Sequence, residues 1–175
     1  SQLKLSDQHQ QQLVDRGLTI EQVKKLGYRT APTYFQIPAL MRSLKETGID
    51  LLSVPGFFLN QKGTAWPMSL PGLLIPYRNT LGQIVGLSIR PDPPWTGGKY
   101  IWFSIPSKGG VGSGTPLHVV QAESKPTEIW ITEGALKADI ASPRLDRTVV
   151  AIAGVPSYKE DELQQTLQQL NTKQV

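Results

Sequence analysis

One glutamate stands where a strand-like segment meets a helix-like segment, a position at which a carboxylate can do chemistry. Residues 129–132 are apolar or β-branched, Glu133 and Gly134 follow, and residues 135–142 favour a helix. In an open sheet of parallel strands, ligands bind at the carboxyl ends of the strands. A carboxylate there can hold Mg²⁺ or act as a general acid or base in phosphoryl transfer. Gly134 would let the main chain approach the bound group closely.

The same glutamate has a simpler interpretation. The helix dipole favours a negative charge at the start of a helix, so Glu133 could be only a cap-like acid. Lys137 follows one turn later, where it could neutralise a phosphate or pair with Glu133 at the i, i+4 spacing. Asp139 lies elsewhere on the predicted helix and is expected at the surface. Spacing alone leaves both interpretations of Glu133 and Lys137 open.

Cationic and aromatic residues gather at the ends of three predicted strands upstream of this acid. Arginines end two of the strands, and a Lys-Tyr pair and a tryptophan lie in the third. This basic series consists of Arg78, Arg90, Lys99, Tyr100 and Trp102. Cations interleaved with aromatic rings suit neutralisation of a nucleic-acid backbone and stacking on unpaired bases. Such rings can equally pack in a core or at its rim, so both roles stay open.

Two kinds of element must position these residues. Ser6 and Thr19 are suited to cap two short helices that Gly27 would close, and residues 38–47 predict a third helix. The following Gly- and Pro-rich part predicts a small, mostly antiparallel sheet with long connections, in which residues 72–91 form a hairpin.

Towards the C-terminus the pattern becomes strand, helix, strand, helix, which requires parallel strands with right-handed crossovers. Residues 128–134 predict a strand covered on both faces, and residues 135–142 a helix that Pro143 breaks. Residues 148–155 predict a second buried strand, and residues 172–175 the entry to a third.

Composition narrows the chemistry. The chain has 175 residues, 39% of them hydrophobic, and a formal charge of +4, which is compatible with an anionic partner. It has no cysteine and two histidines, so disulfides, thiolate zinc sites and cysteine nucleophiles are excluded, and a metal would need carboxylates. There is no signal-like segment and no apolar run approaching the roughly 18 residues of a membrane span. A cytoplasmic protein is therefore expected.

The segment "IWITEGALKADIAS", followed by "TVVAIAGVPSY", resembles the first half of a Toprim domain. This catalytic fold is shared by bacterial-type primases, type IA and type II topoisomerases and some nucleases, and its first strand ends in Glu-Gly. Upstream, "GLLIPYRNTLGQIVGLSIRP" and "GGKYIWFS" are similar, in the same order, to the basic stretch of replicative primases. The resemblance covers about residues 71–155 and is closer to primase-helicases of plasmids, phages or mobile elements than to the housekeeping enzyme.

This resemblance implies an α+β fold in three parts. Residues 1–52 would form a helical lead-in, residues 53–122 a basic, β-rich primase-like subdomain, and residues 126–175 an incomplete Toprim subdomain. Trp102 stands where the housekeeping enzyme has Asn, and Lys137 where it often has Asp, so details of the site are expected to differ.

The implied activity is template-directed primer synthesis by nucleotidyl transfer in the full-length protein. Glu133 would be a catalytic metal ligand for Mg²⁺ or Mn²⁺ with Lys137 beside it, and the basic series would hold single-stranded DNA template and nucleotides. A helicase domain or subunit is an implied partner, and a membrane is not. The Asp-x-Asp pair that completes the Toprim metal site is missing, so the other ligands are expected beyond Val175, and the chain alone is expected to be inactive or weak. The alternatives are a Toprim nuclease or topoisomerase and a non-catalytic single-strand-binding module.

Overall fold

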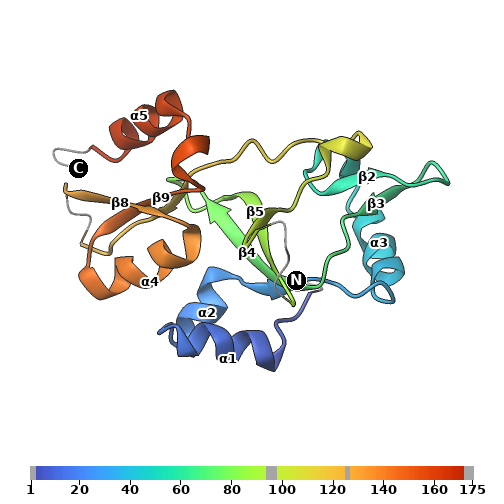
Figure 1. Cartoon of the computed structure of the whole chain (residues 1–175), viewed down its shortest axis with the longest axis horizontal. Helices are drawn as coiled ribbons and strands as arrows, with labels where there is room; N and C mark the ends of the chain where they lie inside the picture. Colours follow the sequence, from blue (N-terminus) through green and yellow to red (C-terminus); the bar gives the residue numbers. More distant parts are fainter. Residues whose placement is uncertain (1–2, 94–97, 125–126, 172–175) are drawn as a thin grey trace.

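The computed structural model describes residues 3–93, 98–124 and 127–171. Along its longest axis (Figure 1) a helix-covered sheet lies at one end, a second sheet in the middle and a small lobe at the other end. The helices are α1 (Asp7–Asp15), α2 (Ile20–Leu26), α3 (Ile37–Lys45), α4 (Ala135–Leu145) and α5 (Glu160–Gln169). The strands are β1 (Arg29–Thr30), β2 (Phe57–Leu59), β3 (Ala65–Pro67), β4 (Gly72–Arg78), β5 (Ile84–Pro91), β6 (Ile101–Trp102), β7 (His118–Val120), β8 (Ile129–Glu133) and β9 (Thr148–Ile152). The predicted α+β class is confirmed.

The predicted caps form the two N-terminal helices. The Ser6 side chain accepts a hydrogen bond from the His9 amide, and Thr19 forms a capping box with Gln22. Gly27 ends α2 in the left-handed conformation, with φ of 79°. Leucines and Val23 of these helices pack on one face of the middle sheet, so α1 and α2 cover that face.

The middle sheet has the strand order β1-β4-β5-β6, all antiparallel. The predicted hairpin is its centre, since β4 pairs with β5 from Gly72 opposite Pro91 to Arg78 opposite Ile84. Its other face packs on Ala31 and Phe103. The predicted third strand is present as the short β6.

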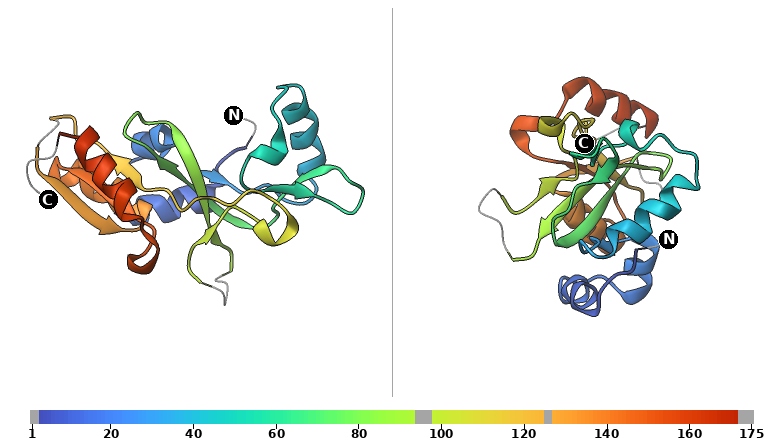
Figure 2. Two further views of the ribbon diagram at one scale, coloured as in Figure 1. Left: turned by 90° about the horizontal axis from the view of Figure 1, so that it is seen from above. Right: turned by 90° about the vertical axis from the view of Figure 1, so that its right-hand side faces the viewer.

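A small lobe holds α3 and the hairpin β2–β3, which the sequence did not predict as a hairpin. Its turn is shaped by Asn60, whose side-chain oxygen accepts hydrogen bonds from the amides of Lys62 and Thr64. A separate core formed by Ile37, Met41, Leu51 and Phe57 holds the hairpin against α3. Figure 2 shows this lobe standing apart from the helix-covered sheet.

The remaining sheet has the order β7-β9-β8. Strands β8 and β9 are parallel, as predicted, and β7 adds to β9 in the antiparallel sense. Helix α4 covers one face through Ala138 packed on β9, and α5 covers the other through Leu163 and Leu167. In Figure 1 the carboxyl ends of β8 and β9 point towards the middle sheet.

Two local predictions for this part were wrong. Strand β8 is not covered on both faces, because it is the edge of the sheet, and Trp130 is 46% and Ile131 39% exposed. Pro143 does not break α4, which runs on to Leu145. A proline in the last turn removes one backbone hydrogen bond close to where the helix ends in any case. The predicted third strand at residues 172–175 lies outside the described residues. Within the described residues, no helix is both long and apolar enough to cross a membrane.

Candidate nucleic-acid and phosphoryl-transfer site

Glu133 is the last residue of β8, opposite Ile152 of β9, and its side chain is exposed. The N-cap of α4 is Gly134, with φ of 89°, and no side chain makes a capping hydrogen bond there. The Gly134 amide instead donates to the Ile152 carbonyl at 2.9 Å. The carboxylate of Glu133 therefore does not cap the helix and is open to solvent at the carboxyl end of a parallel strand.

Lys137 lies in the first turn of α4 and is exposed. The ion pair considered between Lys137 and Glu133 is not among the ion pairs of the described residues. The physical reason is that Glu133 belongs to an extended strand, and Gly134 turns the chain between them, so the helical i, i+4 geometry does not apply. Both charges remain available to a ligand.

The basic series divides into two groups. Arg78 and Trp102 are half-buried and hold the fold together. The Arg78 guanidinium donates to the Leu26 carbonyl at 3.0 Å and to the Gly82 carbonyl at 2.8 Å. The Trp102 ring lies 4.6 Å, between centroids, from that of Tyr77.

The other members of the series are freer. Arg90 is half-buried on β5, and no described ion pair includes it. Tyr100 is 39% exposed, and the ammonium of the exposed Lys99 lies 5.9 Å from its ring centroid. These three residues leave a cationic and aromatic surface available at the β5–β6 edge.

One face of the middle sheet reaches the start of α4 through Tyr77. Tyr77, Ser88 and Trp102 share that face, since Ser88 is opposite both Ile75 and Trp102 in the ladder. Burial raises the pKa of the Tyr77 hydroxyl, and its contacts with Ser88 and with the main chain of Ala135 partly oppose that shift. The Ser88 hydroxyl is close to Tyr77 yet makes no hydrogen bond of normal geometry among the described groups. Tyr77 thus touches α4 two residues after Glu133.

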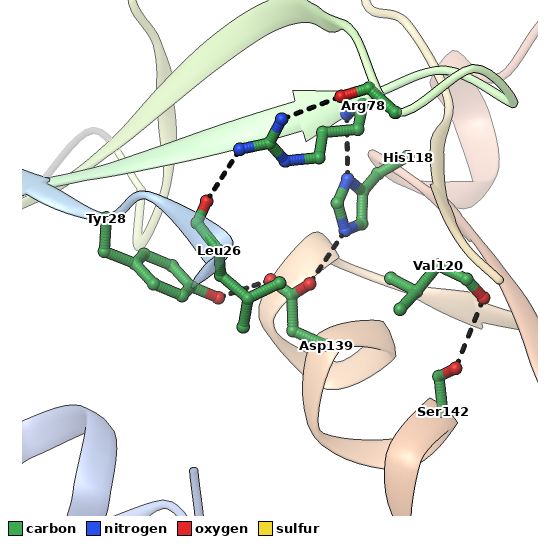
Figure 3. A network of polar contacts seen from close by, with 8 residues as sticks. Leu26, Tyr28, Arg78, His118, Val120, Asp139 and Ser142 are labelled. Carbon is green, nitrogen blue, oxygen red and sulfur yellow. Dashed lines mark hydrogen bonds and ion pairs between the residues drawn. The ribbon is translucent and has the colours of Figure 1, made fainter. Parts of the chain in front are cut away.

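A buried polar network joins the middle sheet to the helix-covered sheet (Figure 3). The Tyr28 hydroxyl donates to Asp139 Oδ2, and Asp139 Oδ1 accepts from His118 Nε2 at 3.1 Å. His118 Nδ1 accepts from the Arg78 main-chain amide at 2.9 Å. Since Nδ1 is an acceptor, the ring proton is on Nε2, which fixes the tautomer. We call Tyr28, Asp139 and His118 the buried network.

The buried network corrects the prediction that Asp139 lies at the surface. Its side chain is 3% exposed, because Asp139 follows the buried Ala135 and Leu136 at the i+4 and i+3 spacings and shares their face of α4. That spacing was the available signal in the sequence. The partners Tyr28 and His118 carried no local signal. Burial, and then the charge of Asp139, raises the pKa of Tyr28 well above its usual value.

A cleft of about 870 Å³ runs beside the network, lined among others by Lys25, Gln121 and Ser142. Glu133 does not line it. Within the described residues no three His, Cys, Asp or Glu side chains form a group that could hold a metal ion. Glu133 supplies one exposed carboxylate, so this part of the chain does not complete a Mg²⁺ site.

No protein-family model and no curated protein matches the sequence. Solved structures do match. The RNA polymerase domain of Mycobacterium tuberculosis primase DnaG, in complex with double-stranded DNA, has a TM-score of 0.71 and 20% identity over 95% of this chain and 54% of that chain. A DnaG primase catalytic domain bound to single-stranded DNA has a TM-score of 0.61 and 19% identity over 97% and 54%.

The Aquifex aeolicus primase, with its zinc-binding and RNA polymerase domains, has a TM-score of 0.67 and 20% identity, over 92% of this chain and 41% of that chain. The chain therefore spans about half the length, or less, of the primase structures it matches. At these identities the similarity establishes the fold alone, which is that of the matched part of these primase structures.

Proposed function

We propose that this chain is the first part of a primase-type catalytic core, which binds single-stranded template and, in a longer protein, makes primers by nucleotidyl transfer. The observation that carries the proposal is the position of Glu133. Its exposed carboxylate lies at the end of a parallel strand. Two residues later, the main chain of Ala135 contacts Tyr77 of the middle sheet. The DNA complexes of the similar primase structures support the choice of partner.

Arg90, Lys99 and Tyr100 are proposed to hold the template strand and nucleotides. The two cations would neutralise phosphates, and the Tyr100 ring would stack on a base. Arg78 and Trp102 are proposed to contribute mainly by holding this surface in place, since both side chains are already engaged within the fold. Lys137 is proposed to face the phosphates beside Glu133.

Glu133 is proposed as one ligand of Mg²⁺ or Mn²⁺ in the longer protein, in the manner of a Toprim domain. The metal would neutralise charge on the transferred phosphoryl group. A further parallel strand could pair with the edge of β8 that no described strand covers, where Trp130 and Ile131 are exposed, and bring more carboxylates beside Glu133. A plasmid, phage or mobile-element origin, an associated helicase and a cytoplasmic location belong to the same proposal. The chain by itself should make little or no primer.

The second candidate is a non-catalytic single-strand-binding module. It needs only the cationic and aromatic surface formed by Arg90, Lys99 and Tyr100, which requires no metal ion. Replacing Glu133 by Gln in the full-length protein separates the two, because Gln keeps the shape and removes the charge. Primer synthesis from labelled nucleotides should fall sharply while binding of single-stranded DNA is retained. Unchanged synthesis would exclude the catalytic role.

Template binding is tested on the chain itself. Arg90→Ala should weaken binding of oligothymidylate and make the negative slope of log affinity against log salt shallower by about 0.7, because one phosphate contact is lost. Arg16→Ala is the matched control, since Arg16 is an exposed arginine at the end of α1. Equal effects of the two substitutions would mean that Arg90 contributes only to net charge.

A further inference from the structure

The lobe formed by α3 and β2–β3 lies at the opposite end of the molecule from β8 (Figures 1 and 2). Four aromatic side chains of this lobe lie in a row. Phe58 and Trp66 lie directly opposite each other in the β2–β3 ladder, so they share one face of the hairpin. The Tyr34 ring centroid lies 6.3 Å from that of Trp66, and the Phe35 centroid lies 6.2 Å from that of Tyr34. We call Phe35, Tyr34, Trp66 and Phe58 the aromatic row.

The outer half of the row is not needed by the hydrophobic core. Phe35 is 91% and Tyr34 67% exposed, whereas the core of the lobe is made by other residues, including Ile37 and Phe57. Leaving two adjacent aromatic rings in water forgoes the burial that normally stabilises such side chains. The packing of the described residues does not explain this exposure, and an external ligand would supply an explanation.

The excess of cations on the lobe favours an anionic ligand. The ammonium of Lys108 lies 4.8 Å from the ring centroid of Phe58, over the inner end of the row. Residues 31–70 contain Arg42, Lys45 and Lys62 against Glu46 and Asp50, so with Lys108 the lobe carries more cations than acids. Exposed aromatic rings on a lobe with an excess of cations suit unpaired bases and their phosphates.

We propose that the aromatic row is a stacking platform for unpaired bases of single-stranded nucleic acid. This inference rests on the proposed template binding and extends it to a second contact area, beyond the surface formed by Arg90, Lys99 and Tyr100. A single strand held at both places would run along the long axis of the molecule. The lobe would then hold the strand at a distance from Glu133.

Two substitutions at Phe35 test the stacking directly, and the 91% exposure means that neither disturbs the fold. Phe35→Trp keeps an aromatic face, and Phe35→Leu keeps apolar character without one. A long oligothymidylate should bind Phe35→Leu roughly five- to 150-fold more weakly than the wild type, the range expected for one stacked base. It should bind Phe35→Trp at least as tightly as the wild type. Leu81→Ala, in a side chain that is 78% exposed outside the row, is the control and should bind unchanged.

Photocrosslinking of an iodouracil-substituted oligonucleotide supplies a second readout, and the adduct should map to Tyr34, Phe35 or Trp66. Three results would overturn the proposal. The first is equal binding by Phe35→Leu and the wild type with Arg90→Ala still weakened, which leaves template binding intact. The second is that the wild type does not bind oligothymidylate at all, which would refute the proposed template binding as well. The third is self-association that Phe35→Leu abolishes in sedimentation experiments, which would make the row an interface between copies.

Discussion

Removing the Tyr28 hydroxyl should destabilise the protein although it changes almost no volume. Tyr28 is 0% and Asp139 3% exposed, so Tyr28→Phe leaves Asp139 Oδ2 buried without its donor. Hydrogen bonds to charged groups contribute about 1.5–3 kcal/mol, and a buried acceptor left without a partner costs a similar amount. We expect the free energy of unfolding to fall by about 2 kcal/mol. No cavity term is added, because the ring stays.

Urea denaturation measures this loss, and the m-value should stay unchanged if the native surface is preserved. Tyr34→Phe is the matched control, since the Tyr34 side chain is 67% exposed. It should change stability by less than about 0.5 kcal/mol. A double-mutant cycle of Tyr28→Phe with Asp139→Asn should give an interaction energy of about 0.5–3 kcal/mol.

Unfolding of Tyr28→Phe at the same urea concentration as the wild type would refute this prediction. That result would mean that the Asp139 carboxylate finds another donor or water in the adjacent cleft, and that the network does not hold the parts together. A loss equal to that of Tyr34→Phe would have the same meaning. Additive effects of Tyr28→Phe and Asp139→Asn would show that their side chains do not act as a pair.

Two further predictions concern pH and the start of α4. Because burial and Asp139 raise the pKa of Tyr28 in the folded state, its contribution to stability is complete below the unfolded value of about 10 and is lost as pH rises above it. Urea midpoints measured from pH 9 upwards should fall less steeply for Tyr28→Phe than for the wild type, and parallel curves would contradict this. Gly134→Ala should cost about 1–3 kcal/mol, because φ is 89° there although a Cβ would meet no atom within 4 Å. An unchanged urea midpoint would show that the strand-to-helix turn relaxes without cost.

The elements that local signals define were predictable from the sequence. Ser6 and Thr19 cap their helices as their residue types suggest, because a cap is decided by a few neighbouring residues. The hairpin at residues 72–91 follows from two apolar runs and a short turn. The parallel pairing of β8 with β9 follows from the length of the intervening helix, which allows a crossover and excludes a tight turn.

Features that depend on distant partners were not predictable in this way. Tyr28 and Asp139 are separated by 111 positions, so nothing near either residue announces the contact. Strand β7 is a second example. It follows the Gly-rich segment of the β-rich middle part in the sequence, yet it pairs with β9 of the C-terminal sheet. The exposure of β8 could not be inferred either, because an apolar strand has the same pattern at the edge of a sheet as at its centre.

Helix α4 fixes the position of Glu133 relative to the middle sheet. Helix α4 begins directly after Glu133, and Asp139, within the same helix, is held by Tyr28 after α2 and by His118 of β7. His118 in turn accepts from the main chain of Arg78, where β4 ends. The position of Glu133 relative to the middle sheet therefore depends on buried polar contacts as well as on apolar packing. Hydrogen bonds have narrower distance and angle limits than apolar contacts, so they suit a junction whose geometry must be defined.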